Sequence, residues 1–240
     1  IKTIQKDSFV GLINLKILSL NKNQLKDLKP FLFEHLRELN DLDIGDNQIK
    51  HVKKSSFYGL ANLKYLKLYR NKIIEFESNT FENLSKLKNL YLGANQLKSI
   101  HKNIFYGLSI SLKALYLGYN KLSEIKPFTF TNLTRLKTLG LNNNQIALID
   151  SRDVFYGLIN LKELNLESNQ LKEIKPFTFS YLKKLYKLNL DKNKIQSLYQ
   201  NSFNGLDNLR YLNLPRNKLS DIDESFFANL TKLVGHKLHR

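Results

Sequence analysis

The chain has 240 residues, a formal net charge of +17 and no cysteine, methionine or tryptophan. Without cysteine there are no disulfide bonds and no thiolate metal sites. The sequence contains no apolar run of about 18 residues that could span a membrane. It also does not begin with the charged and then apolar segment of a signal peptide. These features exclude a disulfide-stapled domain and a transmembrane helix within this sequence.

Taken in order, the chain repeats one pattern from end to end. The residues before Leu15 fit the second half of a repeat, and the step between repeats is then 24 residues seven times and 25 residues twice. This predicts one elongated unit over residues 1–240, with nine full repeats across residues 15–232 and a partial repeat at each end. The first leucines of the full repeats and of the broken tenth are Leu15, Leu39, Leu63, Leu87, Leu112, Leu136, Leu161, Leu185, Leu209 and Leu233.

Each repeat begins with the segment LxxLxL, in which leucines at positions 1, 4 and 6 alternate with variable residues. Side chains of a strand alternate between its two faces, so we expect these leucines in the core and the residues between them at the surface. Parallel strands lie about 4.8 Å apart, whereas the second half of each repeat carries bulkier side chains. The stack should therefore bend toward its strands.

One ladder of asparagines and one of phenylalanines complete the repeat. Position 9 is asparagine in all nine full repeats, and its side-chain amide can bond backbone groups of the turn after the strand. The second half of each repeat holds a phenylalanine, which predicts a stacked aromatic spine on the outer side. The phenylalanines are Phe9, Phe33, Phe57, Phe81, Phe105, Phe130, Phe155, Phe179, Phe203 and Phe227.

The full unit, LxxLxLxxNxLxxIxxxxFxxLxxL, resembles the typical 24-residue leucine-rich repeat of animal extracellular proteins such as Toll-like receptors, Slit-like guidance proteins and small leucine-rich proteoglycans. The resemblance implies an α/β solenoid of mostly short parallel strands. That solenoid would be a right-handed horseshoe with a concave parallel sheet and an irregular convex side. It also implies a binding surface, often flanked by cysteine-rich caps. Because such caps are missing here, the sequence is either a fragment or protected at its ends in another way.

The concave surface can be read from positions 3, 5, 7 and 8 of each repeat. Repeats 3 to 5 place five tyrosines there beside small residues, a composition that favours protein binding, although tyrosines also stabilise sheets by cross-strand pairing. Acidic groups flank them and would suit a basic partner. A calcium site at the three aspartates is disfavoured, because no loop of carbonyl ligands accompanies them. The candidate ligand-binding residues are Tyr65, Lys67, Tyr69, Arg70, Tyr91, Tyr116, Tyr119, Asp41, Asp43, Asp46, Glu163 and Glu167.

Position 2 is basic in seven repeats, which predicts a basic stripe along one flank of the sheet. The stripe is either part of a solvated lysine coat or a surface for a linear polyanion. Its residues are Lys16, Lys64, Lys88, Lys113, Lys137, Lys162 and Arg210.

Three N-x-[ST] sequons, at Asn83, Asn132 and Asn229, fall at one outer repeat position. They are either glycosylation sites of a secreted or ectodomain protein or simply residues that suit a convex turn. The sequence contains none of the HxxxH, CxxC or glycine-rich phosphate-binding motifs, and predicts neither an enzyme nor a cofactor.

Three functions follow from these patterns. The favoured one is a protein-binding recognition module. The alternatives are a matrix or scaffold protein that binds a sulfated glycan or other polyanion through its lysine flank, and a structural subunit that stacks through uncapped ends.

Overall fold

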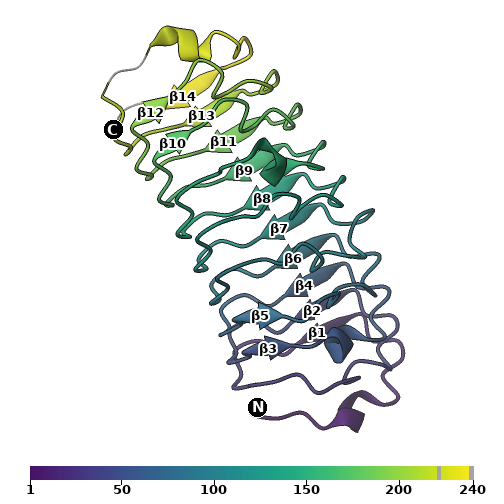
Figure 1. The fold of residues 1–240 in the computed structure, drawn as a ribbon. Helices are drawn as coiled ribbons and strands as arrows, with labels where there is room; N and C mark the ends of the chain where they lie inside the picture. The colour runs from purple at the N-terminus through teal and green to yellow at the C-terminus, as the bar shows by residue number, and fades with distance from the viewer. Residues whose placement is uncertain (221–222, 238–240) are drawn as a thin grey trace.

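The computed structural model describes residues 1–220 and 223–237, so the predicted unit of 1–240 is covered except at five positions. The chain forms one continuous stack of coils whose strands line up along one side (Figure 1). Each coil gives one short strand to a parallel sheet, in the order of the chain. In that order the strands are β1 (Ile17–Ser19), β2 (Asp41–Asp43), β4 (Tyr65–Lys67), β6 (Asn89–Tyr91), β7 (Ala114–Tyr116), β8 (Thr138–Gly140), β9 (Glu163–Asn165), β11 (Lys187–Asn189), β13 (Tyr211–Asn213) and β14 (Gly235–Lys237). The predicted parallel solenoid is confirmed.

The strands span only positions 3 to 5 of each repeat, and equivalent positions pair, as in Tyr91 with Tyr116. They end because the chain turns sharply at position 8. That residue adopts a left-handed backbone with φ between 50° and 58° in all nine full repeats. Position 8 was expected on the strand surface, but it lies in this turn, three residues beyond the end of the strand. This correction applies to Asp46, Arg70 and Tyr119.

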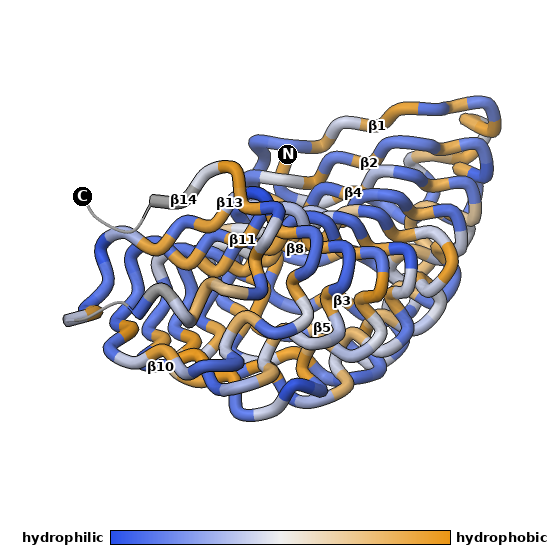
Figure 2. Tube along the Cα trace, turned by 90° about the horizontal axis from the view of Figure 1, so that it is seen from above, coloured by the Kyte–Doolittle hydropathy of each residue, from blue (hydrophilic) through white to orange (hydrophobic). Residues whose placement is uncertain are grey.

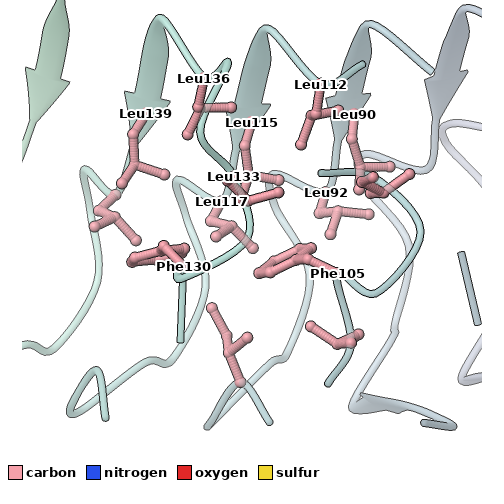
Figure 3. Close-up of a cluster of buried hydrophobic side chains, with 14 of the residues drawn as sticks. Leu90, Leu92, Phe105, Leu112, Leu115, Leu117, Phe130, Leu133, Leu136 and Leu139 are labelled. Carbon is pink, nitrogen blue, oxygen red and sulfur yellow. The ribbon is translucent and has the colours of Figure 1, made fainter. Parts of the chain in front are cut away.

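The core lies between the sheet and the outer segments. Leucines at positions 1, 4 and 6 of neighbouring coils point into the same interior, where they meet a phenylalanine from each coil (Figure 3). Leu90, Leu115 and Leu139, from three adjacent strands, are completely buried. Figure 2 shows apolar and polar stretches alternating along every coil. No coil buries its apolar residues alone, so stability comes from stacking.

The asparagine ladder is confirmed, and it joins neighbouring coils. The side-chain nitrogen of Asn120 donates to the carbonyls of Leu117 (3.0 Å) and Gly118 (3.4 Å) in its own turn, and to Leu92 of the preceding coil (3.0 Å). Its side-chain oxygen accepts from the backbone N–H of Leu97 (3.1 Å). The same bonds recur from Asn47 to Asn217, so each of these amides satisfies backbone groups of two coils.

The convex side is irregular, as predicted. Two small parallel pairs lie there, β3 (His51–Val52) with β5 (Glu75–Phe76) and β10 (Glu173–Ile174) with β12 (Ser197–Leu198). In the described part of the chain all helical segments are single 3-10 turns. They are η1 (Lys6–Phe9), η2 (Lys54–Phe57), η3 (Arg152–Phe155) and η4 (Glu224–Phe227).

The phenylalanine ladder differs from the expected uninterrupted spine, because its rings stack in pairs. Phe105 stacks on Phe130, with ring centroids 6.1 Å apart, but within the described residues no ring contact joins Phe81 to Phe105. The five stacked pairs are Phe9–Phe33, Phe57–Phe81, Phe105–Phe130, Phe155–Phe179 and Phe203–Phe227. We call each such contact a phenylalanine seam.

Between these pairs, a different contact joins the coils. Gly11, Gly59, Gly107, Gly157 and Gly205 follow every second phenylalanine by two residues, and all have positive φ. From Gly59 onward, a Cβ on the glycine would lie 2.2 to 2.7 Å from backbone atoms of the preceding coil. Only glycine permits this approach. We call this contact the glycine seam, and the two seams alternate along the convex side.

Candidate ligand-binding surface

Tyr91 and Tyr116 form the centre of the candidate surface on the exposed side of the sheet. They end the neighbouring strands β6 and β7, where backbone pairing holds them side by side. Their rings stack almost parallel, with centroids 4.8 Å apart and an interplanar angle of 9°. Both are half-buried. Because each ring limits the rotation of the other, the pair is a rigid aromatic platform before any ligand arrives.

The other three predicted tyrosines do not join this platform. Tyr69 follows β4 and lies over Gly45 of the preceding repeat, where a Cβ would be 2.6 Å from its ring. Tyr65 begins β4 and is 37% exposed, while Tyr119 sits in the left-handed turn and is 62% exposed. The structure therefore divides the five tyrosines expected on three strands into one stacked pair and three separate side chains.

Two of the three candidate aspartates of repeat 2 face basic neighbours from repeat 3. The Lys67 ammonium lies 3.0 Å from both carboxylate oxygens of Asp41, and Arg70 lies 3.7 Å from Asp46. Asp43 accepts a hydrogen bond from the backbone N–H of Gly45 at 2.9 Å. Across the described residues, no group of three histidine or acidic side chains could hold a metal ion.

Two tyrosines and one lysine of this surface titrate away from their ordinary values. Burial, with the nearby Tyr91 and Glu163, raises the pKa of Tyr116. Burial, with the charge of Asp43, likewise raises the pKa of Tyr69. Burial acts to lower the pKa of Lys67, but its hydrogen bond to Asp41 and the charges of Asp41 and Asp43 outweigh that effect and raise it. All three groups therefore keep their protons at neutral pH.

A hollow of about 270 Å³ opens beside the platform, over β8 and β9. Its floor contains Gly140, which occupies the position held by Tyr91 and Tyr116 in the two preceding repeats. Tyr116 and Glu163 are among its walls, and Lys187 lies on its far side. Sequence reasoning placed Gly140 on the concave surface but missed the hollow. The available signal was a glycine directly after two tyrosines at one repeat position.

The remaining acidic candidate, Glu167, lies beyond this hollow and is already engaged. It accepts a hydrogen bond from the Asn189 side chain at 3.2 Å and faces the Lys192 ammonium at 3.9 Å. Glu163, by contrast, has no basic group within ion-pair distance among the described residues.

The predicted basic stripe lies at the amino-terminal ends of the strands, one residue before each of them. Each side chain is exposed or half-buried, and in the described chain none of the seven forms an ion pair. The row is interrupted by Asn40 and Tyr186. At its C-terminal part lies an open groove of about 650 Å³, lined by Lys162, Glu163, Lys184, Tyr186, Asn208 and Arg210. The Arg210 guanidinium lies 5.8 Å from the centroid of the Tyr186 ring.

The three sequon asparagines, Asn83, Asn132 and Asn229, are all exposed on the convex side, where a glycan would not collide with the sheet surface. No helix in the described residues has the length and apolar character needed to cross a membrane.

Repeated coils and a continuous parallel sheet define a β-solenoid, and sequence comparison identifies its family. Residues 1–49 and 37–97 match the leucine-rich repeat family, and residues 98–234 match the BspA type leucine-rich repeat region. The chain belongs to the leucine-rich repeat proteins, as its sequence pattern predicted. A comparison with curated proteins finds no match.

Solved leucine-rich repeat structures share the fold. A leucine-rich repeat protein of Leptospira interrogans is 31% identical over 98% of this chain, with a TM-score of 0.82. TLR13, in its complex with ssRNA13, is 25% identical over 95% of the chain, with a TM-score of 0.78. A chain of the complex of latrophilin 3, Unc5D and FLRT2 is 26% identical over 91%, with a TM-score of 0.80. This chain spans 57%, 43% and 65% of those chains, respectively.

Proposed function

We propose that this chain is a non-enzymatic recognition module that binds a protein partner on the concave sheet around repeats 3 to 5. The observation that carries the proposal is the parallel stack of Tyr91 on Tyr116. Tyrosine offers a large contact area with a polar tip, and a ring held in place loses little conformational entropy when a partner binds. The stacked pair is thus suited to be the energetic centre of an interface.

The surroundings of the pair support the same function. Gly93 and Gly118 follow the two tyrosines by two residues and leave the sheet surface low beside them. Lys67 and Asp41 on one side, and Glu163 on the other, supply charged groups at the margin. An aromatic centre with a polar rim is the usual anatomy of a protein interface.

Comparison with solved structures adds support for binding and for the compartment. TLR13 was solved with ssRNA13, and the FLRT2 complex contains latrophilin 3 and Unc5D. By analogy with such recognition solenoids, and with the resemblance to the 24-residue extracellular repeat class, we place this chain outside the cell, as a secreted protein or receptor ectodomain. The exposed sequons fit that location.

The test is to replace both Tyr91 and Tyr116 by alanine and to measure binding to purified extracellular proteins immobilised as an array. A partner captured by the wild type should bind the double variant at least about tenfold more weakly, because interface tyrosines often contribute more than about 1 kcal/mol each. The matched control is Tyr106→Ala, which removes a convex tyrosine that is 58% exposed. Equal capture by the wild type and the double variant would contradict the proposal.

A second candidate function, binding of a sulfated glycan or other polyanion, is favoured by the groove between Lys162, Lys184 and Arg210. Three cations line this groove together with the carboxylate of Glu163, and an anion bound there would release counterions from the cations. Replacing all three by glutamine should lower the salt concentration for elution from heparin by more than the same change at Lys50, Lys98 and Lys121. These control lysines are exposed and lie away from the groove. Equal shifts in the two triple variants would show that only net charge matters.

A further inference from the structure

The aromatic stack of the concave face ends at β7, because the next strand carries glycine at the same position. At position 5, β6 and β7 carry Tyr91 and Tyr116, and β8 carries Gly140. One face of the Tyr116 ring is covered by Tyr91. The other borders the hollow above Gly140, where an added Cβ would be 3.4 Å from Tyr116 Cδ1. The missing third side chain thus leaves space for a flat group from outside.

A carboxylate stands beside that space. Glu163 begins β9, the strand after Gly140, and lines the same hollow. No lysine, arginine or histidine of the described residues pairs with it, although the whole chain carries a net charge of +17. Glu163 also lines the groove of Lys162, Lys184 and Arg210, but none of these three forms an ion pair with it. An unpaired carboxylate next to an open aromatic face favours a planar cation as the ligand.

We propose that the hollow above Gly140 receives the guanidinium group of an arginine side chain from the protein partner, stacked on Tyr116 and paired with Glu163. A guanidinium is planar and weakly hydrated, so it stacks on an aromatic face and bonds a carboxylate at its edge. A lysine ammonium could pair with Glu163 but could not continue the stack. The inference rests on the proposed function and specifies the chemistry of its partner.

The far wall of the hollow limits what lies next to that arginine. Lys187 on β11 is the sheet neighbour of Glu163, yet their side chains form no ion pair. Asn165, the last residue of β9, lines the same hollow. When Glu163 pairs with the guanidinium, the Lys187 ammonium remains available to donate a hydrogen bond to a second group of the partner. The partner segment should therefore present an acidic side chain or a free carbonyl close to its arginine.

The experiment uses the whole chain with tyrosine rings isotopically labelled, and Nα-acetyl-arginine methylamide as the probe. NMR titration should shift the Tyr116 ring resonances, which Tyr116→Phe assigns. The corresponding lysine and citrulline derivatives should bind at least about tenfold more weakly, since the first lacks the plane and the second lacks the charge.

Three variants test the geometry. Gly140→Asn places in the hollow the residue that occupies this position in the next three repeats, so the sheet should tolerate it while the probe is excluded. Glu163→Gln should weaken the probe about tenfold or more. Asp207→Asn, which removes the same charge from an exposed site elsewhere, should leave it unchanged. Thermal unfolding of each variant checks that the fold persists.

The inference is overturned if citrulline binds as well as arginine, or if Gly140→Asn and Glu163→Gln bind the probe as the wild type does. Neither result would contradict the proposed function, provided that the double variant with Tyr91→Ala and Tyr116→Ala no longer captures the protein partner. Conversely, capture unaffected by the tyrosine changes would contradict the proposed function even where the probe binds. The two failures are therefore distinguishable.

Discussion

Gly59 lies directly against the backbone of Glu34 in the preceding coil, so that a Cβ at Gly59 would be 2.6 Å from the Glu34 Cα. Its φ of +92° is also a conformation that side-chain-bearing residues rarely adopt. Both constraints recur at Gly107, Gly157 and Gly205. They explain why every second outer turn of this chain contains glycine.

Replacing Gly59 by alanine should lower the free energy of unfolding by about 3 kcal/mol or more, because the backbone conformation and the close contact are both penalised. Gly11→Ala provides the control. Gly11 has a φ of +83°, but a Cβ there meets nothing within 4 Å, so only the conformational cost of about 1 to 2 kcal/mol remains. Denaturant unfolding measures both. Equal losses would show that the glycine seam is not a steric constraint.

Asn120→Ala should destabilise the chain by about 1 to 3 kcal/mol, because it leaves buried carbonyls and the Leu97 N–H without partners. Asn23 offers a comparison within the same ladder. Its side chain donates only to Leu20 and Asn21 of its own turn and accepts from the amino terminus. Asn23→Ala should therefore cost less in the same urea titration. A larger loss at Asn23 than at Asn120 would contradict this account of the ladder.

The alternating seams predict which phenylalanines are energetically coupled. A double-mutant cycle with Phe105→Leu and Phe130→Leu should give a coupling of about 0.5 to 1.5 kcal/mol from ring stacking. The same cycle across a glycine seam, with Phe81→Leu and Phe105→Leu, should give a smaller value. Unfolding free energies of the wild type, the three single variants and the two double variants decide the matter, and similar couplings across both seams would disprove the pairing.

Alkaline titration should report on Tyr116. Its pKa is raised above the ordinary value near 10, so between these two values the folded chain holds a proton that the unfolded chain has released. Stability should then fall as pH rises through this window. Tyr116→Phe cannot ionise and should lose less stability than the wild type there. Thermal unfolding at several alkaline pH values measures the difference, and identical curves would count against a raised pKa.

The sequence predicts most of the fold because the repeat fixes which residues are inside. The leucines at positions 1, 4 and 6 and the asparagine at position 9 have one role in every coil, and the structure places them there. The pairing of the phenylalanines was missed. It depends on a close backbone contact at Gly59 and its equivalents, and a pattern of apolar residues does not describe how far apart two outer turns lie.

The candidate site was less predictable than the core. The repeat pattern places Tyr69 and Tyr91 on the same surface. Tyr69, at position 7, covers Gly45 of the preceding repeat, whereas Tyr91, at position 5, stacks on Tyr116 of the next one. The left-handed turn at position 8 also moves Tyr119 off the sheet. The hollow above Gly140 arises from a side chain that is absent, so its two candidate lining residues, Tyr116 and Glu163, were predicted as surface residues without the hollow between them.

The alternation of phenylalanine and glycine seams makes two coils, rather than one, the modular unit of this solenoid. Removing a single coil would bring together two coils that are not neighbours in the native order. The new junction would then lack either the glycine that a glycine seam needs or the matching ring that a phenylalanine seam needs. Shortening or lengthening by pairs preserves both kinds of junction. Engineering of this scaffold should therefore proceed in steps of about 48 residues, the usual spacing of the seam glycines.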